Sequence, residues 1–253
     1  MKKIYIAMAA ALMLAACGKE NGGVAEQGYD SFVISVADLG GVGNAKAHWG
    51  SANSNGFYWD NGDGVLINGI EHTVHGSGHG TWTTKGERVD PIDDGFFYVA
   101  SYNGGVRTDR AINGGRSYGP VAFNGGIPLA CKGKTNKLTL YPCCAVLKVV
   151  NAGSDVATLF LSQEVPLAGT IDIASATVQG SDYTDAFEEV QGSDGTVYFV
   201  LPMESGSIST TIYIEDGDGN SKETPDEVTI QKGCLYEIDM QAEDDTKGVP
   251  VRD

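Results

Sequence analysis

The sequence predicts an all-β protein, and three observations carry this prediction. The 253 residues include 35 glycines without a three-residue period, which indicates many turns rather than a collagen helix. Short runs of alternating apolar and polar residues stand between clusters of Gly, Asn, Asp and Ser, as expected for half-buried strands. Apolar residues at helical spacing are scarce. Strands joined by tight turns are therefore expected throughout the chain.

The first residues resemble a bacterial lipoprotein signal. Lys2 and Lys3 form a basic start, and the apolar run over residues 4–14 is well short of the roughly 20 residues that a membrane-spanning helix needs. The segment Leu14-Ala15-Ala16-Cys17 resembles the lipobox, which implies cleavage before Cys17 and acylation of that residue, for example with palmitate. We expect a signal peptide over residues 1–16 and a durable lipid anchor at Cys17.

The next part of the chain is a tether followed by a series of strands. Residues 17–28 are polar and rich in glycine, which is typical of a flexible, lipidated tether. Residues 104–126 read as a long connection and residues 242–253 as a polar tail. Strands are predicted over residues 31–36, 56–59, 65–67, 96–101, 138–150 (with Pro142 as a point of bending), 157–161, 171–173, 197–201, 210–214, 228–230 and 236–240.

The alternation of apolar and polar residues becomes more regular near residue 138. The first half is irregular, whereas most strands of the second half alternate cleanly between apolar and polar residues. This change predicts an N-terminal β domain over residues 29–138 and a C-terminal β domain with a polar tail over residues 139–253. Each would hold about 110 residues, which is a normal size for a β-sandwich.

Segments spread through the chain are similar to those of a known family. They are the lipobox, Trp59-Asp60-Asn61-Gly62-Asp63, the strand over 138–150, Leu167-Ala168-Gly169-Thr170, Phe199-Val200-Leu201-Pro202-Met203 and Lys232-Gly233-Cys234-Leu235-Tyr236-Glu237-Ile238. Through them the chain resembles the fimbrillin-like lipoproteins of Bacteroides-type bacteria. The resemblance implies two tandem transthyretin-like antiparallel β-sandwich domains. It also implies a surface-exposed, outer-membrane lipoprotein that serves cell adhesion as a subunit, anchor or accessory component of a fimbria (pilus).

The resemblance further implies assembly by strand exchange. A cut after a basic residue removes the lipid and the first strand, and the bared sheet edge accepts a strand from another fimbrial subunit. The basic residues between Cys17 and the body of the fold are Lys19 and Lys46, and the first arginine, Arg88, is expected between strands. The protein could therefore be a permanently lipidated anchor as well as a stalk subunit. The implied partners are other subunits, the outer membrane and a host glycan or protein receptor.

The charge of the chain limits the classes of partner that it is expected to bind. The formal net charge is −16, and the sequence holds no basic stripe, so nucleic acid is excluded as a partner.

Besides Cys17, the cysteines are Cys131, Cys143, Cys144 and Cys234. Four cysteines of an exported protein can form disulfides in three pairings, or they can be small buried apolar residues, which is the slightly favoured interpretation. Adjacent residues of a strand face opposite ways, so Cys143 and Cys144 are not expected to pair with each other.

Two clusters have residue types that bind metals. His72, His75 and His79 could ligate zinc, but the first two would face opposite sides of a strand, and the neighbouring glycines favour exposed loop histidines. Asp216, Asp218, Asn220 and Glu227 match the first, third, fifth and twelfth positions of a calcium loop. Ser221 stands where that loop requires glycine and the flanks read as strands, so an acidic hairpin loop is favoured.

The sequence has no H-E-x-x-H motif and no phosphate-binding glycine loop between a strand and a helix. We therefore predict a non-catalytic protein without a cofactor. The alternative is a lipid-anchored glycan-binding module that uses Trp49, Trp59, Trp82, Tyr58 and Tyr102, although these also suit a core. A metal-dependent hydrolase using the three histidines is the least favoured hypothesis.

Overall fold

All secondary structure in the described part of the protein is β, as the sequence predicts. The computed structural model describes residues 28–37, 40–41, 59, 61–77, 80–102, 112–113, 116–123, 126–153, 156–190, 196–224 and 226–241. The strands are β1 (Tyr29–Val36), β2 (Gly40–Gly41), β3 (Gly64–Ile67), β4 (Ile70–His75), β5 (Trp82–Val89), β6 (Phe97–Tyr102), β7 (Ile112–Asn113), β8 (Ser117–Ala122), β9 (Pro128–Gly133), β10 (Lys137–Pro142), β11 (Cys144–Val150), β12 (Val156–Asp172), β13 (Thr177–Val190), β14 (Val197–Pro202), β15 (Ser207–Thr210), β16 (Ile212–Asp216), β17 (Ser221–Glu223), β18 (Val228–Gln231) and β19 (Cys234–Asp239).

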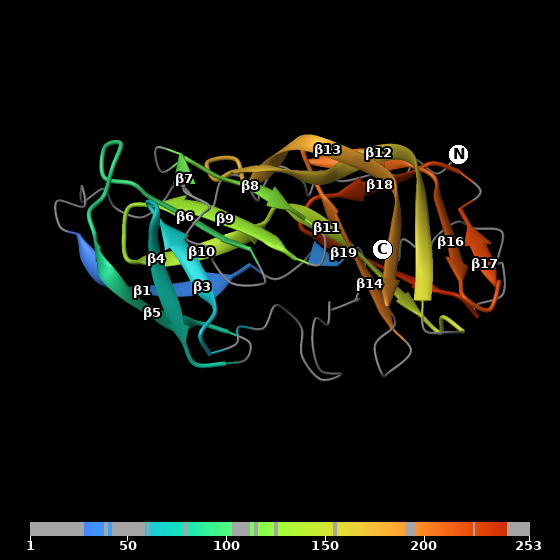
Figure 1. Ribbon diagram of the computed structural model, residues 1–253, viewed down its shortest axis with the longest axis horizontal. Helices are drawn as coiled ribbons and strands as arrows, with labels where there is room; N and C mark the ends of the chain where they lie inside the picture. Colours follow the sequence, from blue (N-terminus) through green and yellow to red (C-terminus); the bar gives the residue numbers. More distant parts are fainter. Residues whose placement is uncertain are drawn as a thin grey trace, which may run out of the picture.

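The first half forms a closed barrel of seven strands in the order β1-β10-β9-β6-β3-β4-β5, at the left of Figure 1. Alternate residues of each strand point inward, so Phe32, Val65, Val99 and Leu140 meet in one core. The β3–β4 turn is Asn68-Gly69, and both residues have a positive φ (47° and 87°). Asparagine and glycine tolerate that conformation best, and it matches the twist of a tight hairpin.

The second half, at the right of Figure 1, stacks two larger sheets. One has the order β14-β11-β19-β2, and the other has the order β17-β16-β12-β8-β7 with β13 paired to β12. Leu147, Leu159, Phe199 and Ile214 are fully buried between them. A small sheet of β15 and β18 adds Ile230 to the same core.

The long β12–β13 hairpin connects the two halves and runs along the top of Figure 1. One end of β12 pairs with β16 and the other end pairs with β8. Beyond β8, Ile171 and Val178 of the hairpin pack on Leu66 and Ala100 from the outer face of the barrel. The halves thus share sheets and a core, and the domain boundary near residue 138 and the tandem transthyretin-like arrangement stay predictions.

Several local expectations are wrong. The predicted strand over residues 138–150 is two strands, β10 and β11, which lie in different sheets and are separated at Cys143. The predicted connection over 104–126 contains β7 and β8, and β4, β5, β9 and β13 were not expected as strands. Three strand pairs, β1–β10, β11–β19 and β2–β19, are parallel, in contrast to the antiparallel sheets that the family resemblance implies.

Candidate assembly site around the first strand

The first strand, β1, is inserted between two barrel strands. It pairs in parallel with β10 and antiparallel with β5, and so closes the barrel. The backbone N–H of Val33 donates to the carbonyl of Asn136 at 2.7 Å, and that of Ala37 donates to Leu140 at 2.8 Å. Both edges of β1 are therefore occupied, and its removal would bare the edges of β5 and β10.

Two side chains of β1 fill the barrel. Phe32 and Ile34 are both fully buried. The Phe32 ring lies 5.0 Å from the ring of Phe97, 5.7 Å from Tyr29 and 5.4 Å from His72 (centroid distances). The outward-facing side chains of β1 are less buried than Phe32 and Ile34. Among them, Ser35 Oγ lies 3.1 Å from Thr139 Oγ1. A strand that replaced β1 would thus need two large apolar residues spaced two apart.

The chain reaches β1 past an ion pair at the end of β5. Arg88 Nε lies 3.1 Å from Asp90 Oδ1, and a Cβ on the buried residue Gly28 would meet both side chains and the carbonyl oxygen of Val89. Only glycine leaves room for this approach. Arg88 lies inside β5, so the expectation that it stands between strands is wrong.

The predicted histidine cluster is divided by β4. His72 is fully buried, whereas His75 is exposed and His79 lies outside the described residues. Nε2 of His72 donates to the carbonyl of Glu87 at 2.9 Å, and its Nδ1 lies 3.4 Å from Thr84 Oγ1. Burial lowers the pKa of His72. His72 is thus a core residue of a strand, not the exposed loop residue that its neighbouring glycines suggest.

The predicted calcium-like residues lie at the tip of the β16–β17 hairpin and beyond it. The buried Asp216 carboxylate accepts four N–H bonds of 2.8–3.0 Å, from the backbones of Gly153, Asp218 and Asn220 and from Asn220 Nδ2. Burial alone would raise the pKa of Asp216, but these bonds hold it below its usual value. Glu227 instead accepts from Ser209 Oγ at 3.0 Å. Asp216 therefore organises the hairpin tip through N–H donors.

No group of three or more His, Cys, Asp or Glu side chains within the described ranges is arranged to hold a metal ion. The zinc and calcium hypotheses stay predictions.

The cysteines among the described residues are buried and form no disulfide with one another; they are Cys131, Cys143, Cys144 and Cys234. Cys143 packs in the core beneath the β12–β13 hairpin and Cys144 packs in the barrel core, on opposite sides of the chain as alternation predicts. Burial raises the pKa of the Cys143 thiol to about 12, and it also raises the pKa of the Cys144 thiol well above its ordinary value. Cys17, the predicted lipidation site, lies outside the described residues.

The aromatic residues considered for glycan stacking do not form one surface where they are described. Trp59 is buried in the barrel core, and Trp82 is half-buried against it. Trp49 and Tyr58 lie outside the described residues, and the side chain of Tyr102 is not described.

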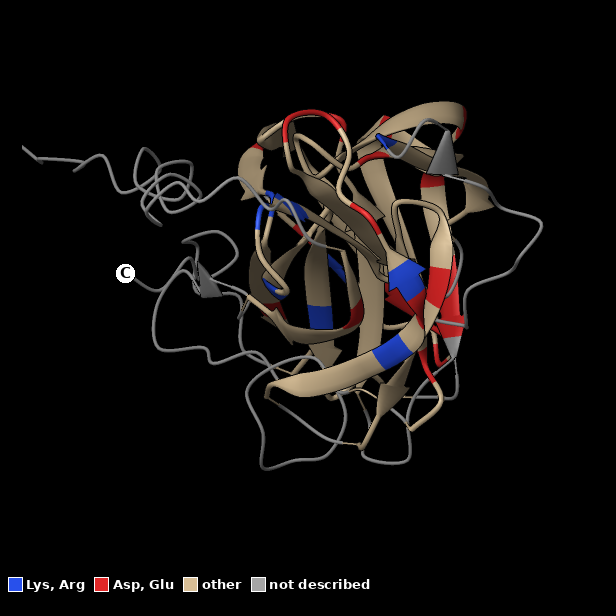
Figure 2. Cartoon of the chain, turned by 90° about the vertical axis from the view of Figure 1, so that its left-hand side faces the viewer, with Lys and Arg blue, Asp and Glu red and all other residues tan. Residues whose placement is uncertain are grey.

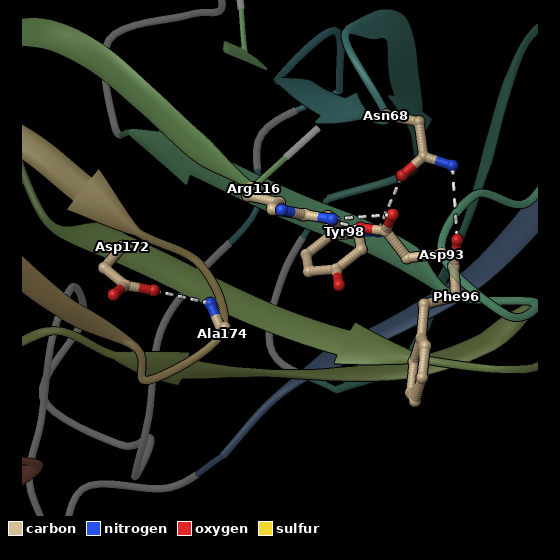
Figure 3. Close-up of polar contacts among 7 residues, drawn as sticks. All are labelled: Asn68, Asp93, Phe96, Tyr98, Arg116, Asp172 and Ala174. Carbon is tan, nitrogen blue, oxygen red and sulfur yellow. Dashed lines mark hydrogen bonds and ion pairs between the residues drawn. The ribbon is translucent and has the colours of Figure 1, made fainter. Parts of the chain in front are cut away.

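A polar cluster near the β3–β4 turn orders an end of the barrel (Figure 3). Arg116 binds both carboxylate oxygens of Asp93, at 2.7 and 2.8 Å, and thereby lowers the pKa of Asp93. Asn68 donates to the carbonyls of Asp90 and Phe96 and accepts from the backbone N–H of Tyr98. These bonds fasten the turn to the loop before β6, which is a structural role.

The outer edge of β13 carries a set of side-chain caps that the sequence analysis missed. The backbone N–H of Gly180 donates to Glu204 Oε1 at 2.8 Å, and Tyr183 OH donates to the same oxygen at 2.9 Å. The backbone N–H of Tyr183 donates to Asp182 Oδ1, and that of Ala186 donates to Thr184 Oγ1. These donors are unavailable to an added strand, so this long edge is protected from strand addition.

Comparisons with known proteins find distant structural similarity. A candidate cell adhesion protein from Bacteroides uniformis is 14% identical with a TM-score of 0.45, over 72% of this chain and 87% of its own. A candidate cell adhesion protein from Bacteroides ovatus is 11% identical with a TM-score of 0.42, over 83% of this chain and 91% of its own. No protein-family model matches the chain, and neither does any curated protein. Among the described residues, no helix is long and apolar enough to cross a membrane.

Proposed function

We propose that this protein is a surface-exposed, lipid-anchored component of an adhesive fimbria, and that it joins other subunits by exchange of its first strand. The observation that carries the proposal is the position of β1. It directly follows the predicted tether, yet it fills the barrel with Phe32 and Ile34 and occupies the edges of two strands. A strand at this place can be supplied by the chain itself or by a neighbour.

The role of the protein depends on whether the chain is cut, and after which basic residue. A cut after Lys46 would remove β1 and also β2, which pairs with β19 in the second half. A cut after Lys19 would remove the lipid and leave both strands. Without a cut, Cys17 holds the chain on the outer membrane as an anchor or accessory subunit. The capped edge of β13 favours the β1 position as the place of exchange.

The proposed role is not catalytic. The thiols of Cys143 and Cys144 are buried with raised pKa values, and the imidazole of His72 is hydrogen-bonded in the barrel core. A thiol becomes nucleophilic as its thiolate, which burial disfavours. These groups support a scaffold that binds other molecules.

The test is strand replacement in the mature chain, residues 17–253 with Cys17→Ala, which keeps every described strand. A protease site is inserted after Lys46 and cut, the released fragment 17–46 is separated from the rest of the chain in denaturant, and a fluorescent peptide with the sequence of residues 29–36 is added as the remaining chain refolds. We expect the cut chain to bind about one equivalent of peptide, because the bared edges and core positions accept it. A matched peptide with Phe32→Asp should not bind, and neither peptide should bind the uncut chain. A cut chain that binds no peptide, or binds both equally, would refute strand exchange at β1.

A further inference from the structure

The two halves of the molecule differ in how far their charged side chains are engaged in contacts within the chain. In the described residues after Cys143, the cations are Lys148, Lys222 and Lys232, and all three are bound within the chain. Lys148 pairs with Glu237 at 2.8 Å, Lys222 donates to the carbonyl of Asp239, and Lys232 donates to the carbonyls of Ser175 and Ala176. The other acidic groups on this half therefore have no further lysine or arginine to pair with among the described residues of the same half.

One outer sheet surface of the second half joins exposed aromatic rings to such acidic groups. Phe160 on β12 is 40% exposed, and its ring lies 5.7 Å from that of Tyr213 on β16. Cross-strand pairing places Glu188, Glu215 and Glu223 on the same surface around them. We call these five residues the acidic aromatic face. Aromatic rings beside carboxylates attract cations through both the ring face and the negative charge.

The barrel carries the complementary surface. Lys132, Lys134 and Lys137 belong to the β9–β10 hairpin, here named the lysine hairpin, and none forms an ion pair with a described residue. The ammonium groups of Lys132 and Lys134 lie 5.4 and 4.5 Å from the ring centre of Phe96. Within the chain, the lysine hairpin thus already makes contacts between ammonium groups and an aromatic ring, which is the kind of contact that the acidic aromatic face offers. Figure 2, which views the barrel end, shows basic segments among its strands.

We propose that the acidic aromatic face binds the lysine hairpin of a second copy of this chain. The two surfaces belong to opposite halves, with the barrel at one end of the molecule and β16 and β17 at the other (Figure 1). The contact is heterologous, so a pair of copies keeps one unused surface of each kind, and further copies can add in rows. It leaves β1 in place and is therefore independent of strand exchange.

A second copy is the occupant that charge complementarity favours. The lysine hairpin supplies the cations that the acidic aromatic face lacks, on a chain with a formal net charge of −16. Exposed charges attract over a screening length of about 10 Å at 0.1 M salt and about 3 Å at 1 M, so the contact should weaken steeply with salt.

The test is sedimentation equilibrium of the uncut mature chain with Cys17→Ala. We expect the weight-average mass to rise with protein concentration at 20 mM salt and to stay monomeric at 500 mM salt. One variant reverses the hairpin (Lys132→Glu with Lys134→Glu) and another reverses the face (Glu188→Lys with Glu215→Lys). Each should be monomeric alone, because its two surfaces then carry like charges, and an equimolar mixture of the two should associate again.

The control variant is Glu71→Lys with Glu87→Lys, which makes the same charge change as the reversed face at exposed residues of β4 and β5, outside both surfaces, and should associate as the unchanged chain does. A wild-type chain that stays monomeric at 20 mM salt up to about 1 mM protein overturns the proposal without any variant. A monomeric mixture of the two reversed variants, or an equal loss of association in the Glu71→Lys, Glu87→Lys control, overturns it as well.

Discussion

Replacement of Phe32 by alanine tests the importance of β1 for the barrel. Phe32 is fully buried and contacts three aromatic rings, so the change removes a ring that no neighbour can replace. Comparable core substitutions cost about 3–5 kcal/mol, from lost burial and from the cavity left behind. A protein of ordinary stability, about 5–15 kcal/mol, would lose a large share of its free energy of unfolding.

The assay is urea unfolding of the mature chain, followed by tryptophan fluorescence. The matched control is Ser35→Ala on the same strand, which removes one contact with Thr139 Oγ1 and should cost about 1 kcal/mol or less. We expect the Phe32→Ala midpoint to fall well below that of the control. Equal midpoints for the two variants would show that β1 contributes little to the barrel and would refute the reasoning.

Four other predictions follow from the described side chains. Burial lowers the pKa of His72 below 6.5, so on acidification the unfolded chain binds a proton at this residue before the folded chain does. The stability that neutral His72 contributes should therefore be complete above pH 6.5 and decrease as the pH falls below that value. Urea midpoints at pH 7.5 and 5.5 should differ less in His72→Gln than in the unchanged chain. Buried thiols with raised pKa values should leave the native mature chain, with Cys17→Ala, without a fast-reacting equivalent of a thiol reagent, and one rapid equivalent would contradict their placement. Glu204→Ala uncovers the N–H of Gly180 and should increase light scattering on incubation, whereas Glu188→Ala on the face of the same sheet should not. Asp216→Ala leaves Gly153, Asp218 and Asn220 without their acceptor and should cost about 1.5–3 kcal/mol in urea unfolding, and a cost below that of Asp226→Ala would contradict the role of Asp216 at the hairpin tip.

The sequence predicts those strands that have one buried and one exposed face. β1 and β14 were found because their buried residues alternate with partly exposed ones. β13 was missed because it is an edge strand whose described side chains are mostly exposed or half-buried, so its sequence shows few apolar residues. Its stability comes from pairing along β12, which no local pattern reveals.

Long-range contacts also explain the other errors. The apolar run over 138–150 joins β10, in which alternate residues are buried, to β11, which is almost wholly buried, yet the chain passes from one sheet to another at Cys143. His72 lies two residues before the buried Val74 on β4, and this alternation is the signal that could have placed it in the core. The Glu204 cap could not be foreseen, because it joins residues 24 positions apart through the tertiary fold.

The most direct test of the account is the intact mass and N-terminal sequence of the protein isolated from its native cell. The account predicts a chain that begins either at an acylated Cys17, as an anchor, or directly after Lys46 with β1 and β2 removed, as a subunit that has received a strand from a neighbour. A chain that begins at Met1, or at Cys17 without a lipid, would contradict it.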